Sequence, residues 1–186
     1  MKKNLIETKD KQSYRNWRQG NPYVHGREDC IRLRFQDVDP HLFTENEGLI
    51  TSLAIMLRHF RIEKEEQENH FNPWILYRKL FLCKAFDSQG LLSLRAVERL
   101  YPLDYAGTMT YSQENLKAVW DTGQPFLITV SGIQGTKHYL VPDFMIRDDM
   151  AVIDCLWDRQ YLSEYEKVFE LQVFWKSTEG MMYCIE

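Results

Sequence analysis

A histidine and an aspartate in the second half of the chain are spaced like the two supporting members of a nucleophilic triad. His138 opens the run His-Tyr-Leu-Val at 138–141, and Asp154 follows sixteen residues later inside the apolar run 151–157. An imidazole activates a neighbouring thiol or hydroxyl, and a carboxylate holds the imidazole in the orientation that this requires. These residue types therefore predict hydrolase-type chemistry wherever a nucleophile faces His138.

The element expected to carry that nucleophile is an upstream helix. Apolar residues recur at helical spacing over residues 48–60, which predicts a core helix beginning near Gly48. A thiol at a helix start has a lowered pKa and is therefore reactive. The start of this predicted helix has no cysteine. The chain thus has the supports of a cysteine hydrolase without the attacking atom.

Other elements follow from periodicity and from helix start signals. Residues 1–27 are polar and predict an N-terminal arm, and residues 28–186 predict a single domain. The predicted elements are a strand at 31–35, helices at 73–86, 94–100 and 113–120, strands at 125–131, 138–146, 150–157, 171–176 and 181–185, and a helical piece at 163–170. Helices come first and strands second without alternation, which is typical of an α+β fold with an antiparallel sheet.

Composition excludes several classes of function. The chain has 186 residues, a net charge of −4 and 44% hydrophobic residues, which favours a globular protein and disfavours a nucleic-acid partner. It has neither a membrane-length apolar segment nor a Sec signal peptide, so we expect a cytoplasmic protein without a membrane partner and leave signal-less secretion open. The four cysteines are far apart and are expected to be reduced. The histidines do not have the spacing of metal ligands, so we expect neither a metal site nor a cofactor.

Four stretches in order resemble the papain-like cysteine peptidases of the bacteriocin-processing, double-glycine leader peptidase type. They are residues 33–36, 51–57, 123–130, and 138–141 together with Asp154. The resemblance covers residues 31–160 and implies a papain-like α+β fold, with N-terminal helices packed on a C-terminal antiparallel sheet. It also implies that His138 and Asp154 correspond to the catalytic dyad and that Gln36 corresponds to the glutamine that stabilises the oxyanion.

The resemblance breaks at the nucleophile. The cysteine of the family aligns with Gly48 or with Glu47, and neither residue can do thiolate chemistry. Substitute nucleophiles remain open: Cys30, or Thr51 or Ser52 if the helix is shifted.

The spacing between His138 and Asp154 sets a condition on the sheet. A two-residue turn at 148–149 would place a residue several positions beyond Asp154 across from His138, because partners in a hairpin have a constant sum of positions. Pairing with Asp154 therefore requires a bulge or a longer loop, and Pro142 makes an irregularity plausible because it cannot donate to a ladder. Without such pairing, His138 is an ordinary strand-end histidine, and Asp154 caps a turn or pairs with a lysine.

The function that the resemblance implies is a bacterial pseudopeptidase whose relic cleft binds an extended polypeptide. Tyr139 and Trp157 flank the dyad in the sequence and are expected to line that cleft. Two other functions remain open. One is an active hydrolase or acyltransferase with a relocated nucleophile, and the other is an accessory or effector protein that uses the fold only as a scaffold. The sequence gives neither the oligomeric state nor the identity of the partner.

Overall fold

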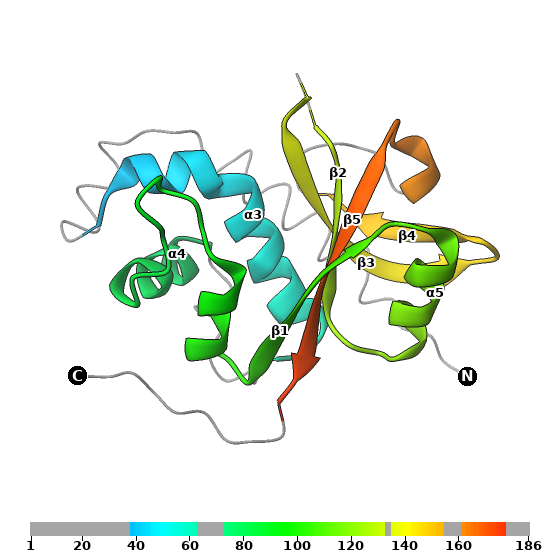
Figure 1. The fold of residues 1–186 in the computed structure, drawn as a ribbon, viewed down its shortest axis with the longest axis horizontal. Helices are drawn as coiled ribbons and strands as arrows, with labels where there is room; N and C mark the ends of the chain where they lie inside the picture. The colour runs from blue at the N-terminus through cyan, green and yellow to red at the C-terminus, as the bar shows by residue number, and fades with distance from the viewer. Residues whose placement is uncertain (1–37, 63–72, 133–134, 155–160, 178–186) are drawn as a thin grey trace.

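The computed structural model describes residues 38–62, 73–132, 135–154 and 161–177. Along the chain, two helices and a 3-10 turn precede a five-stranded sheet, and a further helix lies between its first two strands (Figure 1). The predicted arm at 1–27 and the predicted strands at 31–35 and 181–185 lie outside the described residues. No helix in the described ranges is long and apolar enough to cross a membrane.

The longest helix is α3, Pro40–His59. Asp39 caps its start by accepting a hydrogen bond from the His41 N–H at 2.9 Å, and Pro40 occupies the first turn, where its missing donor costs nothing. The prediction that this helix begins near Gly48 is wrong, because Asp39 and Pro40 start the helix. Glu47 and Gly48 therefore lie well inside α3.

The next elements pack beside α3. Helix α4, Pro73–Leu82, is shorter than predicted, and the predicted helix at 94–100 is the 3-10 turn η1, Leu94–Arg99. The loop between them is fixed by Asn46, whose side-chain amide donates to the Gly90 carbonyl at 2.8 Å and accepts from the Leu92 N–H at 3.1 Å. A buried amide with these partners ties the loop to α3.

Strand β1, Leu103–Thr110, was not predicted. Most of its residues are small or polar and have exposed side chains. The sequence therefore lacks the alternation of apolar and polar residues from which a strand is predicted. Helix α5, Gln113–Asp121, confirms the helix predicted after Ser112, whose hydroxyl accepts from the Asn115 N–H at 3.0 Å. Gly123, at φ 66°, follows the helix in the left-handed conformation that favours glycine.

The sheet is antiparallel throughout, in the order β1-β5-β2-β3-β4. Its other strands are β2 Phe126–Ser131, β3 Lys137–Ile146, β4 Asp149–Ile153 and β5 Val168–Lys176. The short turn η3, Leu162–Glu164, precedes β5, so most of the helical piece predicted at 163–170 is not helical. The sheet confirms the α+β class, with the correction that one strand precedes α5.

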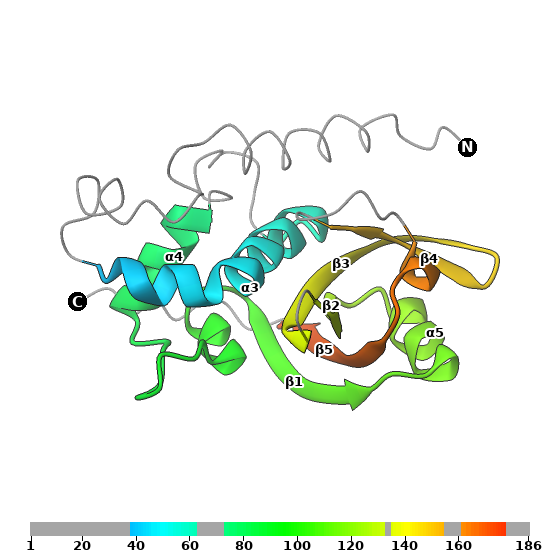
Figure 2. The ribbon, with the colours of Figure 1, turned by 90° about the horizontal axis from the view of Figure 1, so that it is seen from above.

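Two cores lie on the two faces of this sheet. The first core contains α3, α4, η1 and the sheet residues Leu127, Val141 and Phe174. The second core contains α5, η3 and sheet residues that alternate along the strands with those of the first core, among them Ile128 and Leu140. Figure 2 shows α3 and α5 on opposite sides of β3. Strands whose two faces are both covered read as continuous apolar runs, which is why 126–130 was recognisable in the sequence.

Candidate functional site

His138 and Asp154, which the sequence paired, lie together in the structure. The imidazole Nε2 of His138 is 2.9 Å from Oδ1 of Asp154. The two side chains are only 4% and 0% exposed. With Asp154 ionised, Nε2 carries the proton and donates it to the carboxylate, as in the supporting half of a triad. The pair is thus formed, and it is closed to solvent.

A β-bulge makes this pairing possible. The β3–β4 hairpin turns at Arg147 and Asp148, one residue earlier than predicted, with Ile146 paired to Asp149. The register then shifts by one between Phe144 and Pro142, so Val141 pairs with Ile153. If this shifted register continues by one residue, Asp154 lies beside Leu140, on the face of the sheet to which His138 points. Without the shift, Asp154 would lie beside Val141, on the opposite face. The irregularity expected near Pro142 is confirmed.

A third residue completes the cluster. The Tyr165 hydroxyl donates to Oδ2 of Asp154, so the carboxylate is held from both oxygens. Tyr165 follows η3 and lies in the second core. Sequence reasoning missed it because a tyrosine after a short turn carries no motif or spacing that ties it to His138. We call His138, Asp154 and Tyr165 the buried triad.

The buried triad belongs to the second core, on the side of the sheet away from α3. In the β2–β3 ladder Val130 pairs with His138, and Ile128 pairs with Leu140. Val130, Ile128 and Leu140 all contribute to the second core, and side chains of directly paired residues point to the same face. Tyr139 and Val141 alternate with them and pack toward α3. The imidazole is therefore directed away from the helix expected to carry a nucleophile.

The nucleophile position offers no replacement chemistry. Gly48 is inside α3, where a side-chain Cβ would meet no atom within 4 Å, so space does not exclude a cysteine there. A carboxylate oxygen of Glu47 is shielded from solvent. Because neither residue is at the helix start, the unsatisfied N–H groups that lower a thiol pKa are not available to them.

The hydroxyl alternatives serve the fold. Ser52 is buried and donates its hydroxyl proton to the Tyr139 carbonyl at 2.8 Å, which joins α3 to β3. Thr51 is also buried in the helix. Neither is presented to a substrate, which disfavours both as relocated nucleophiles. Cys30, Gln36 and Trp157 lie outside the described residues.

Tyr139 lies on the α3-facing side of the sheet among polar side chains from four strands. We call these residues the polar row: Tyr105, Thr108, Thr129, Lys137, Tyr139, Glu170 and Gln172. Gln172 accepts from the Tyr105 hydroxyl at 2.5 Å, and Lys137 pairs with Glu170 at 2.8 Å. Burial raises the pKa of the Tyr139 phenol. The charge of Lys137 lowers this pKa, whereas Glu170 and Tyr105 raise it. Tyr139 thus belongs to a surface separate from the buried triad, although it follows His138 in sequence.

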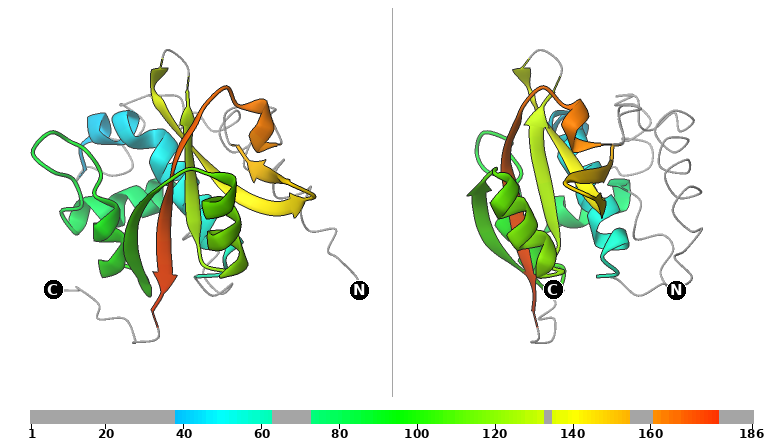
Figure 3. Two further views of the ribbon diagram at one scale, coloured as in Figure 1. Left: turned by 45° about the vertical axis from the view of Figure 1, so that its right-hand side comes forward. Right: turned by 90° about the vertical axis from the view of Figure 1, so that its right-hand side faces the viewer.

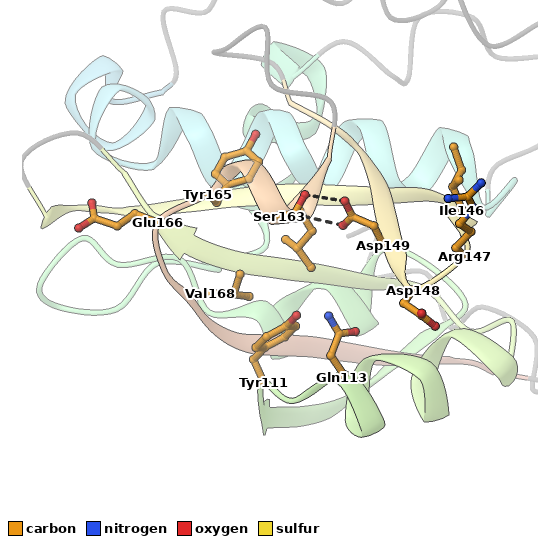
Figure 4. Close-up of a pocket in the computed structure, with 11 residues that line it drawn as sticks. Tyr111, Gln113, Ile146, Arg147, Asp148, Asp149, Ser163, Tyr165, Glu166 and Val168 are labelled. Atoms are coloured by element: carbon orange, nitrogen blue, oxygen red, sulfur yellow. Dashed lines mark hydrogen bonds between the residues drawn. The ribbon is translucent and has the colours of Figure 1, made fainter.

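A pocket of about 590 Å³ opens on the second-core side (Figure 4). It lies between the β1–α5 junction, the β3–β4 turn and η3, and its lining includes Tyr111, Gln113, Asp149 and Ser163. Sequence reasoning did not identify any of these residues, because they come from three separate turns. The part of the chain that the structure describes has no group of His, Cys, Asp and Glu side chains able to hold a metal ion.

Comparisons with known proteins add no assignment. The chain matches no family model, no curated protein and no solved structure.

Proposed function

We propose that this chain is a catalytically inactive, papain-like domain that binds an extended polypeptide segment. The observation that carries the proposal is the closure of the His138–Asp154 pair on the sheet face away from α3. A general base must come within hydrogen-bond reach of its nucleophile, and a side chain that is 4% exposed and directed into a core does not meet a substrate. The ordered sequence motifs at 33–36, 51–57, 123–130, and 138–141 together with Asp154, support the resemblance to papain-like peptidases.

The binding surface that the geometry favours is the free edge of the sheet at β1. In the described residues β1 pairs only with β5. The Tyr105 N–H bonds to Glu98 and the Thr110 carbonyl accepts from Asn115, so a further strand would pair with the main-chain groups between these two positions (Figure 3). Met109 on β1 and Trp175 on β5 are 38% and 45% exposed, so both offer apolar surface beside this edge. Strand addition takes affinity from main-chain hydrogen bonds and selectivity from alternate side chains.

The polar row extends this surface on the other face of the same strands. Tyr105 and Thr108 of β1 bond to each other and to Gln172, so a peptide added to β1 would have hydroxyl groups beside one face and Met109 beside the other. The surface that we propose therefore includes Tyr105 and Thr108 of the polar row. It excludes His138 and Asp154, and Tyr139 lies on β3, three strands from the β1 edge in the order of the sheet.

A displayed library of random peptides selected on the full chain tests the proposal. We expect the selected peptides to lose binding to Met109→Lys by about tenfold or more, because a charge on an edge strand blocks pairing. The control is Leu82→Lys, which places the same charge at a residue 57% exposed at the end of α4. Binding at β1 would be refuted by any of three results: the two variants lose affinity equally, the selected peptides bind Met109→Lys as well as the wild type, or no peptide is selected. Turnover of a selected peptide would refute the inactive state.

A further inference from the structure

The pocket on the second-core side gathers oxygen-bearing side chains from different turns around one hollow. Tyr111 and Gln113 stand on the wall at the start of α5, opposite Asp149 and Ser163 on the wall formed by β4 and η3 (Figure 4). Leu162 and Val168 supply apolar surface between these walls. Convergent polar groups over an apolar base are typical of small-molecule sites.

The acidic group at its centre is held in place by the protein itself. The Asp149 carboxylate accepts from the Met150 N–H at 2.9 Å, the Ser163 N–H at 3.2 Å and the Ser163 hydroxyl at 2.5 Å. These bonds join the β3–β4 turn to η3, so the carboxylate has its orientation before any ligand arrives. Preorganisation of this kind lowers the entropy cost of binding.

The electrostatics of the lining favour a cation. Three carboxylates, Asp148, Asp149 and Glu166, line the pocket against the single guanidinium of Arg147. Burial raises the pKa of the Tyr111 phenol, and the Asp149 charge raises it further. Tyr111 therefore stays protonated at neutral pH, and its neutral oxygen remains available as a hydrogen-bond acceptor.

We propose that this pocket binds a primary ammonium group. An ammonium has three donors and no acceptor, and Asp149, Tyr111 and Gln113 offer acceptor oxygens around one hollow. The group is carried either by a free alkylamine or by a lysine side chain. The pocket includes no residue of the polar row and makes no use of the β1 edge, so the proposal stands independently of polypeptide binding there.

Titration of the full chain with putrescine, followed by amide NMR, tests the site. We expect saturable shifts at Tyr111, Gln113, Met150 and Ser163, and none with 1,4-butanediol, which has a similar length and no charge. A blocked Gly-Lys-Gly peptide and its norleucine analogue form the second arm. Tighter binding of the lysine peptide identifies a protein side chain as the source, and tighter binding of putrescine identifies a free amine; both support the site.

Two variants assign the acceptors. Asp149→Asn removes the charge and is expected to weaken putrescine binding about tenfold or more, because hydrogen bonds to charged groups are the strong ones. Tyr111→Phe removes one acceptor, keeps the ring, and is expected to weaken binding about threefold to tenfold even if Asp149→Asn fails to fold. The control is Asp121→Asn, an exposed acid at the end of α5 and outside the pocket.

Three results would overturn the proposal. They are a lack of saturable shifts with both amines, equal shifts with the diol, and an equal loss of affinity in Asp121→Asn and in the pocket variants. The last result would mean that putrescine senses only the overall negative charge of the protein, which salt would screen.

Discussion

Helix α3 and the second core use buried polar groups in different ways. The buried side chains Asn46 and Ser52 of α3 bond to main-chain groups and join elements. On the α5 side, the buried triad joins three titratable side chains to one another. Main-chain partners are neutral and available anywhere in a fold, whereas a buried imidazole–carboxylate pair must have its partner placed by the register of the sheet. The second arrangement is costly to form, and here it lies inside a core.

The largest effect expected from this contrast is on stability. Asp154→Ala removes the acceptor that both His138 and Tyr165 use, and should lower the free energy of unfolding by about 3 kcal/mol or more. Ser52→Ala, on the other face, removes one hydroxyl bond to a carbonyl and should cost about 1 kcal/mol. Urea unfolding of both variants measures the difference.

A double-mutant cycle sharpens the same comparison. The losses in His138→Ala and Asp154→Ala should not add, because each substitution removes the same bond. Additive losses, or a cost for Asp154→Ala no larger than that of Ser52→Ala, would show that the buried triad does not stabilise the second core.

A smaller effect is expected at alkaline pH on the α3 side. Burial raises the pKa of Tyr139 in the folded state above that in the unfolded chain. The protonated phenol therefore contributes stability that is fully present below about pH 10 and is lost as pH rises through the folded-state pKa. The free energy of unfolding should fall less between about pH 8 and about pH 11 in Tyr139→Phe than in the wild type. An equal fall in both proteins would mean that Tyr139 titrates like an exposed tyrosine.

The sequence predicted what depended on local signals and on apolar period. The cap at Ser112 predicted α5, and the apolar run at 126–130 predicted β2. The bulge near Pro142 followed from counting positions between His138 and Asp154. These features are set by residues close together in the chain or by the constant sum of the positions of paired residues in a hairpin.

Features set by packing between distant residues were missed. Strand β1 has a polar, exposed sequence and exists because β5 pairs with it. Trp175 is exposed although it follows the buried Phe174, because successive residues of β5 point to opposite faces of the sheet. The face to which His138 points follows from its partner Val130 in β2, which spacing along one strand does not reveal.

The thiol pKa of Gly48→Cys, obtained from the pH dependence of its alkylation, tests most directly whether the nucleophile position and His138 are uncoupled. A Cβ added at Gly48 would meet no atom within 4 Å. Gly48 lies inside α3, and His138 is directed into the opposite core, so we predict a value near that of free cysteine, about 8.5. A value lowered into the range of about 3.5–7.5 seen for activated cysteines would contradict this account, because it would require His138 or a helix start to act on the thiol.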